Sequence, residues 1–240
     1  MKVSLFQIPS GLGRTELENL VVSELNYESS LGVKSELYLL PEYVNTSFLP
    51  EAIISNSVSR ETLSDYFLFE LSKKYKTNIV AGLSTYSMEV GNKAYYNSLI
   101  WFHANGENPI IYDKINLCDL PPYCEKNIFL EGNGSKFIRY GDQIFGLLIC
   151  YDVYKEDLFR EYQENGVSTI LVSAAWPKIR IEKLIRILTE RAKKFKLTIL
   201  LSNYSGSEIA FEYGECTCRI DQLGQVEMIK KGDLFLKLDI

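Results

Sequence analysis

Hydrophobic positions follow two different spacings along the chain, and this predicts an alternation of strands and helices. Short apolar or alternating runs indicate strands, whereas apolar residues three and four apart indicate amphipathic helices. The expected strands are residues 2–8, 36–41, 77–86, 94–103, 108–117, 168–176 and 198–203, with two more around a turn within 136–150. The expected helices are residues 14–29, 60–75, 154–165 and 179–195. The last forty residues alternate between turns at 221–225 and 230–233, which predicts an antiparallel run.

The order of these elements indicates an α/β fold. Two helices belong to each half of the chain, so the sheet surface must be covered in both halves. We therefore expect a four-layer α-β-β-α sandwich, with two mixed sheets face to face and helices outside. The length of 240 residues and the lack of a linker or repeat suggest that residues 1–240 form a single domain.

Composition narrows the class of protein and its partners. Apolar residues make up 46% and charged residues 24%, which is typical of a soluble globular chain. The net charge of -5 argues against nucleic acid or an anionic membrane as the main partner. No apolar stretch approaches the ~20 residues of a membrane span. The apolar run among the first residues is too short for a signal peptide. We expect a cytoplasmic protein with reduced thiols.

Cysteine and histidine usage limits the possible chemistry. The five cysteines are odd in number and contain no Cys-x-x-Cys pair, which argues against a disulfide framework, a zinc site or a redox-active pair. We expect neither a metal nor a cofactor. His103 is the chain's one histidine and precedes an Asn-Gly turn. An enzyme built on this chain is therefore expected to use a carboxylate or a lysine as its base.

Three chemically active side chains interrupt apolar strands. Glu42 follows the run at 36–41, Lys114 lies within the run at 108–117, and Cys150 ends the run "FGLLIC". Each has an ordinary interpretation: a cap, a lysine reaching water, and a packed thiol. Strand ends in α/β proteins form ligand clefts, so an acid, an ammonium and a thiol at three such places favour a catalytic site.

The segments "LYLLPEYV", "IIYDKINLCD" and "FGLLICYDV" resemble, in order, the three motifs of the nitrilase superfamily of carbon–nitrogen hydrolases. "YYNSLIWFHANGE" and "STILVSAAWP" add to a resemblance that covers most of the chain. It implies catalytic roles for Glu42, Lys114 and Cys150. "PYCEKNIFLEGNG" resembles the segment that carries a second glutamate, a role we assign to Glu125, with Glu131 as the competing position.

The resemblance also implies a reaction. Cys150 would attack a small amide and form a thioester, while Lys114 and the backbone N–H of Tyr151 stabilise the oxyanion. Trp176 and Pro177 end the next expected strand and should line the pocket, and Tyr123 should contact the substrate. The expected partners are a small-molecule amide or carbamoyl substrate and a second copy of the chain, in a homodimer or larger homo-oligomer.

Two alternatives remain at this point. The segment "YCEKNIF" also resembles that of N-carbamoyl amine hydrolases, which is the first alternative. The second, from a different functional class, is a catalytically silent binding subunit. The sequence departs from the family after Cys-Tyr-Asp, where Lys155, Glu156 and Asp157 replace the usual aromatic-Pro-Glu triplet. The identity of the amide is not encoded in any motif.

Overall fold

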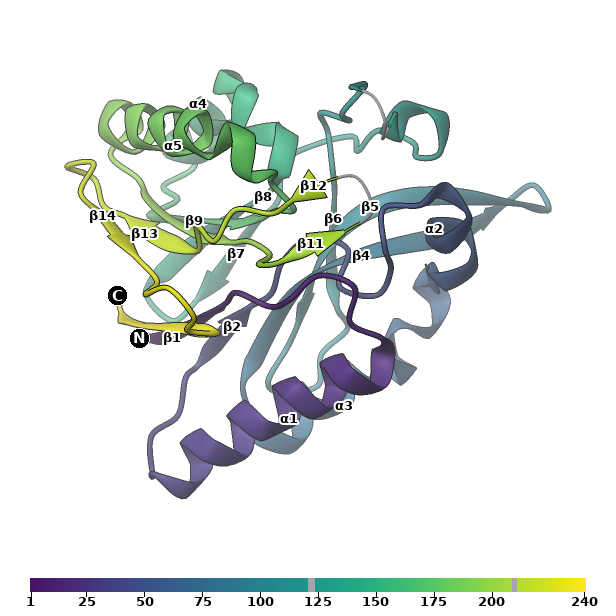
Figure 1. Cartoon of the computed structure of the whole chain (residues 1–240), viewed down its shortest axis with the longest axis horizontal. Coiled ribbons are helices and arrows are strands. Elements are labelled where there is room, and N and C mark those ends of the chain that lie inside the picture. Colours follow the sequence, from purple (N-terminus) through teal and green to yellow (C-terminus); the bar gives the residue numbers. More distant parts are fainter. Residues whose placement is uncertain (121–123, 209–210) are drawn as a thin grey trace.

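Two mixed β-sheets face each other in the computed structural model, which describes residues 1–120, 124–208 and 211–240 (Figure 1). The larger sheet contains, in spatial order, β15 (Phe235–Asp239), β1 (Lys2–Phe6), β2 (Leu37–Leu39), β4 (Asn78–Glu89), β5 (Asn92–Phe102) and β6 (Ile110–Asp113), and β3 (Val58–Ser59) pairs with β4. The smaller sheet contains β14 (Val226–Met228), β13 (Cys218–Ile220), β10 (Thr198–Ser202), β9 (Thr169–Ser173), β8 (Gln143–Ile149) and β7 (Phe137–Tyr140). A separate short ribbon joins β11 (Ser207–Glu208) to β12 (Phe211–Glu212).

Helices cover the outer face of each sheet. The helices α1 (Arg14–Ser30) and α3 (Phe67–Tyr75) pack on the larger sheet, and α4 (Glu156–Glu164) and α5 (Ile181–Phe195) pack on the smaller one (Figure 1). A third apolar layer, which includes Leu5, Trp101 and Leu147, fills the space between the sheets. The expected four-layer sandwich is therefore confirmed, because each sheet buries one face against its partner and the other against helices.

Some elements differ from those expected. The short helix α2 (Pro50–Asn56) was not predicted, since seven residues are too few to display a helical period. The region 60–75 divides into the 3₁₀ helix η1 (Arg60–Asp65) and α3, because Tyr66 between them is extended. The C-terminal run also divides: β13 and β14 form a hairpin in the smaller sheet, whereas β15 crosses to pair with β1.

The sheets are joined where β2 and β9 end. The Ser173 hydroxyl donates a hydrogen bond to the Leu40 carbonyl (3.0 Å), and the Glu42 backbone N–H donates to the Ala174 carbonyl (3.4 Å). These bonds hold the segment after β2 against the segment after β9. Residues that follow strands of different sheets consequently meet at this end of the sandwich.

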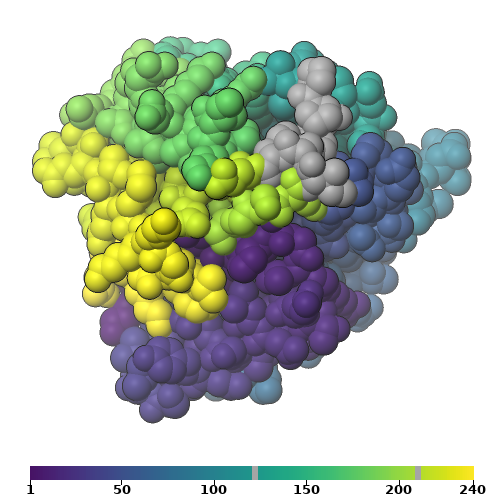
Figure 2. Space-filling view, in the orientation of Figure 1, coloured from purple at the N-terminus to yellow at the C-terminus, as the bar shows by residue number. Residues whose placement is uncertain are grey.

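The space-filling view shows the C-terminal segment lying over the N-terminal segment and beside α5 (Figure 2). Every helix in the described parts of the chain is too short or too polar to cross a membrane.

Candidate active site

Cys150 sits at a sharp turn between a strand and a helix. Strand β8 is buried from Phe145 to its end at Ile149, and Cys150 then opens the 3₁₀ helix η3 (Cys150–Tyr154) with a φ of 41°. This left-handed conformation is unusual for a residue other than glycine and carries a cost in backbone energy. The turn places Cys150 at the edge of the core, where it packs against buried apolar side chains and is itself partly exposed.

The carboxylate of Asp152 holds this turn in place. It accepts hydrogen bonds from the backbone N–H of Ile149 (2.9 Å), the hydroxyl of Tyr112 (2.7 Å) and the backbone N–H of Asn116 (2.7 Å). Asp152 is fully buried, and burial raises its pKa to about 6. Through Tyr112 and Asn116, the turn that carries Cys150 is tied to the segment that carries Lys114.

Glu42 lies where the two sheets are joined. Its Oε2 atom accepts a hydrogen bond from the backbone N–H of Ala175 (3.0 Å), and its side chain is almost fully buried. Gly82 of β4 passes directly beneath it, because a Cβ atom there would lie 2.5 Å from the Glu42 Cα. The backbone of Glu42 is therefore packed against the larger sheet, and its carboxylate is bonded to the segment after β9.

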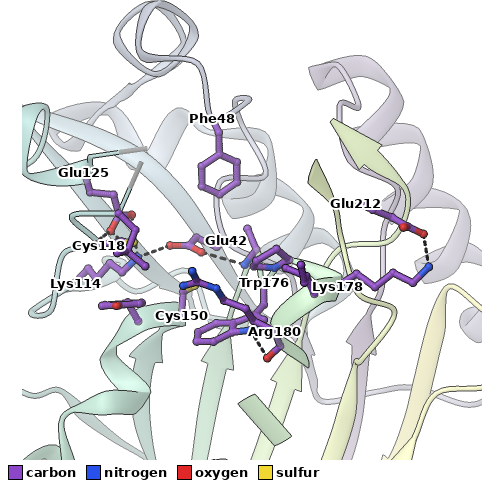
Figure 3. A pocket seen from close by; sticks show the side chains of 15 residues that line it. Glu42, Phe48, Lys114, Cys118, Glu125, Cys150, Trp176, Lys178, Arg180 and Glu212 are labelled. Carbon is purple, nitrogen blue, oxygen red and sulfur yellow. Dashed lines mark hydrogen bonds and ion pairs between the residues drawn. The ribbon is translucent and has the colours of Figure 1, made fainter. Parts of the chain in front are cut away.

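Lys114 lies between two carboxylates. Its Nζ atom is 2.9 Å from Glu42 Oε1 and 2.8 Å from Glu125 Oε1 (Figure 3). Its backbone is anchored on both sides, since the Lys114 N–H donates to the Asn97 carbonyl (2.9 Å) and the Gly132 N–H donates to the Lys114 carbonyl (2.8 Å). Lys114 follows β6 rather than lying within it, as β6 ends at Asp113.

Two further side chains, which were not predicted from the sequence, complete this cluster. Asn97 donates from Nδ2 to Glu42 Oε1 (2.7 Å) and to Glu125 Oε1 (2.9 Å). The hydroxyl of Tyr43 donates to Glu125 Oε1 (2.6 Å), and the Cys118 backbone N–H donates to its Oε2 (2.6 Å). The available signal for Asn97 was a polar residue in an otherwise apolar part of its strand.

Burial and charge set the protonation of the cluster. Burial raises the pKa of Glu42, although the Lys114 ammonium opposes this shift. Burial acts to lower the pKa of Lys114, but the carboxylates of Glu125 and Glu42 outweigh it and hold that pKa well above its usual value. Burial, together with Glu42, raises the pKa of the Cys150 thiol. These surroundings thus favour the protonated form of the Cys150 thiol and the charged form of Lys114.

A cavity of about 530 Å³ opens onto these side chains (Figure 3). Of the residues singled out in the sequence, those that line it are Glu42, Lys114, Glu125, Cys150, Tyr151, Trp176 and Pro177. Glu131 is exposed and is not among the lining residues that the structure describes, so Glu125 is the acid that joins the cluster. Tyr123 lies outside the described residues.

The departure from the family motif lies away from this cavity. Glu156 forms ion pairs with Arg191 and Lys194 of α5, and Asp157 pairs with Arg160 (2.9 Å). Lys155 is exposed at the start of α4. Glu156 therefore connects α4 to α5, and Asp157 forms an ion pair within α4.

Comparisons with known proteins place the chain among hydrolases. A model of the carbon–nitrogen hydrolase family matches residues 2–195. A "hydrolase in agr operon" of Staphylococcus aureus is 24% identical over 89% of this chain and 80% of that protein. The 2-oxoglutaramate amidase of Bacillus subtilis is 25% identical over 93% of this chain and 84% of the enzyme. A solved amidase from Nesterenkonia sp. shares the fold, with a TM-score of 0.81 at 21% identity, covering 99% of this chain and 90% of that one.

Proposed function

The chain belongs to the carbon–nitrogen hydrolase family of the nitrilase superfamily, and we propose that it is an amidase that uses Cys150 as its nucleophile. The reaction would convert a small amide and water into a carboxylic acid and ammonia. One arrangement supports this proposal. The Lys114 ammonium is held between the buried carboxylates of Glu42 and Glu125, and these groups line the same cavity as the partly exposed Cys150.

Glu42 is proposed to activate the thiol. A thiolate is the attacking species, and the raised pKa of Cys150 means that it must lose its proton during the attack. Glu42 has a raised pKa, which makes it a better proton acceptor than an ordinary surface carboxylate. As sulfur bonds to the amide carbon, the proton passes to Glu42, and the charge of Lys114 offsets the negative charge that develops.

The oxyanion of the tetrahedral intermediate would receive two donors. One is the Lys114 ammonium, and the other is the backbone N–H of Tyr151 in the first turn of η3, where N–H groups have no acceptor within the helix. Loss of one such donor typically costs about 3–4 kcal/mol of transition-state stabilisation. Glu42 then returns the proton to the amide nitrogen, the C–N bond breaks, and ammonia leaves a thioester on Cys150.

Water completes the cycle. Glu42 would take a proton from a water molecule whose oxygen attacks the thioester carbon, and the C–S bond would break as the proton returns to sulfur. Glu125 is proposed as a positioning residue, because it accepts a hydrogen bond from Lys114 and is itself fixed by bonds from Tyr43, Asn97 and Cys118.

The test replaces the proposed nucleophile. With an amide that the wild type hydrolyses, Cys150→Ala should lower the rate of ammonia release by at least about 10⁴-fold. Cys124→Ala is the matched control, since this partly exposed thiol is not among the cavity-lining residues. Chloroacetamide should label Cys150 before Cys118 and Cys124 in peptide mass spectrometry. Ammonia release by Cys150→Ala at the wild-type rate contradicts the proposal, and carbon dioxide released with ammonia identifies a carbamoyl substrate instead.

A further inference from the structure

A second cavity, of about 760 Å³, lies at the end of the sandwich opposite to Cys150. Asn78 opens β4, which runs parallel to β2, so Asn78 lies at the end where β2 begins and not at the end that leads to Glu42. Tyr140 ends β7 and pairs with Gln143 at the start of β8, whose other end leads to Cys150. Asn78 and Tyr140 both line this cavity, which shares no residue with the first cavity in the described parts of the chain.

Trp101 supports the wall of this cavity from the core. Its fully buried indole donates from Nε1 to Asn78 Oδ1 (3.1 Å), and the Ala104 backbone N–H donates to the same oxygen (3.2 Å). The centroid of the Trp101 ring lies 6.2 Å from that of His103 and 6.4 Å from that of Tyr140. His103 follows β5 of the larger sheet, Tyr140 ends β7 of the smaller one, and both are partly exposed. One ring from each sheet therefore borders the cavity on a fixed support.

Positive charge gathers around these two rings, although the net charge of the chain is -5. Lys73, Lys76 and Arg139 line the cavity, and among its described lining residues Glu107 is the one carboxylate. The Lys73 Nζ atom lies 3.1 Å from Glu70 Oε1. No carboxylate lies within ion-pair distance of Lys76 or Arg139 in the parts of the chain that the structure describes. The second cavity therefore carries an excess of positive charge.

The end of a helix explains only part of this charge. Lys73 and Lys76 lie at the C-terminal end of α3, where the helix dipole favours cations even without a ligand. Arg139 is an exposed residue of β7 in the other sheet, so the dipole of α3 does not account for its place at the same cavity. Burial lowers the pKa of His103, so its imidazole is uncharged near pH 7 and offers a planar face in place of a further cation. The cavity thus combines cations with uncharged rings.

We propose that the second cavity binds a nucleoside phosphate. Arg139 and the two lysines of α3 would bind the phosphate groups, because guanidinium and ammonium groups form charge-assisted bonds with phosphate oxygens. The rings of His103 and Tyr140 would contact the base, since bases stack on aromatic side chains. The volume of the cavity is within the usual range of small-molecule sites. The proposal does not depend on the amidase function, because the two cavities lie at opposite ends of the sandwich.

His103 provides a direct readout of binding, because it is the chain's one histidine. In the untagged protein, its ring protons give one set of imidazole signals in a proton NMR spectrum. Titration with ADP at about 0.15 M salt should shift these signals until the site is saturated, and calorimetry should give the same Kd. ADP should bind at least about tenfold more tightly than inorganic phosphate or adenosine, since each of these makes only part of the contacts. The absence of both heat and a shift up to about 5 mM ADP overturns the inference.

Two double variants that remove the same charge test the contacts. Lys76→Gln combined with Arg139→Gln should weaken ADP binding about tenfold or more. Lys74→Gln combined with Arg186→Gln is the matched control, since both residues are exposed and neither is among the described residues that line the cavity. Equal binding by the wild type and the first variant, or equal weakening in both variants, contradicts the proposal. An ADP complex that leaves the His103 signals unmoved would lie elsewhere on the protein and contradicts it as well.

Discussion

At the scale of single residues, Asn97 connects the two acids of the site. Its Nδ2 group donates to both Glu42 and Glu125, whereas its Oδ1 atom is buried with no hydrogen-bond partner among the described residues. An unsatisfied buried oxygen costs free energy, so this side chain is present for its donor group. The donated bond lowers the pKa of Glu42 against the larger, opposite effect of burial.

Replacement of Asn97 should therefore change the pH dependence of catalysis. In Asn97→Leu, Glu42 loses a donor to its charged form, so its pKa rises further. Because Glu42 must be ionised to accept the thiol proton, the acid limb of the kcat/KM profile should move to higher pH, with about a tenfold or greater loss at pH 7. Asn165→Ala, at the exposed end of α4, is the control. An acid limb that stays in place in Asn97→Leu, with the fold intact by circular dichroism, rules out this role.

The sequence predicts the reactive members of the site better than the residues that hold them. Glu42, Lys114 and Cys150 are charged or nucleophilic side chains in apolar surroundings, and their motifs resemble those of a known family. Tyr43 and Asn97 lie in segments that share the resemblance, but their phenol and amide side chains do not by themselves indicate a role in the site. Their role comes from distances between atoms that are far apart in the chain, and only the folded arrangement of β4, β5 and the segment after β2 sets these distances.

At the scale of elements, the close passage of β4 beneath Glu42 depends on Gly82. A Cβ at this position would lie 2.5 Å from Glu42 Cα, 2.9 Å from the Pro41 carbonyl oxygen and 2.8 Å from Ser173 Oγ. The Gly82 backbone also donates to the Pro41 carbonyl (3.1 Å) and accepts from the Val44 N–H (2.9 Å). The main chain on both sides of Glu42 is thus bonded to a strand that has no room for a side chain.

A methyl group at Gly82 should displace the Glu42 carboxylate, the base of the proposed reaction. Gly82→Ala is expected to lower the free energy of unfolding by about 1–3 kcal/mol, as is usual when a packed interior is overfilled, and to reduce kcat as Glu42 moves. Gly134→Ala is the control, because no atom lies within 4 Å of a Cβ placed there; its change in stability should be within about 0.5 kcal/mol. Urea denaturation and steady-state kinetics provide the two measurements. Normal stability and kcat in Gly82→Ala would show that the strand can move away without cost.

Periodicity predicts the long elements and fails for the short ones. Helices α1 and α5 carry enough turns to display their apolar face, and both begin within a few residues of the expected positions. The seven residues of α2 do not. The crossing of β15 to the larger sheet could not be predicted either, because an alternating strand does not indicate which sheet edge it will join.

At the scale of the whole molecule, β15 closes the larger sheet and brings the two ends of the chain together. It pairs antiparallel with β1 along five residues, and the N-terminal amine donates to the Ile240 carbonyl (2.8 Å). Lys237 of β15 also reaches α1, where its Nζ atom lies 2.7 Å from Glu24 Oε1 and 3.1 Å from Glu28 Oε1. One strand thus connects the C-terminus to the first strand and to the outer helix layer.

The pH dependence of stability should reveal this connection. Burial acts to raise the pKa of Glu28, but hydrogen bonds from Tyr38, Ser35 and Lys237 outweigh it, and the pKa lies below its ordinary value of 4.5. A carboxylate whose pKa is lowered by folding stabilises the fold at every pH above its pKa in the unfolded chain. This contribution is lost as the pH falls through its pKa in the folded protein. Lys237→Met should therefore lower the free energy of unfolding by about 1 kcal/mol at pH 7, since the lysine is partly exposed.

The difference between this variant and the wild type should persist at each pH above 4.5 and shrink as the pH falls below it, because a protonated Glu28 no longer attracts Lys237. Urea denaturation at pH 7 and at about pH 3.5 measures both limits. Lys230→Met is the control, as Lys230 is an exposed lysine in the loop before β15 and should show no such dependence. A deficit in Lys237→Met that is equal at both pH values would mean that the lysine stabilises the fold through the packing of its aliphatic stem, and that the last strand is held to α1 without help from its charge.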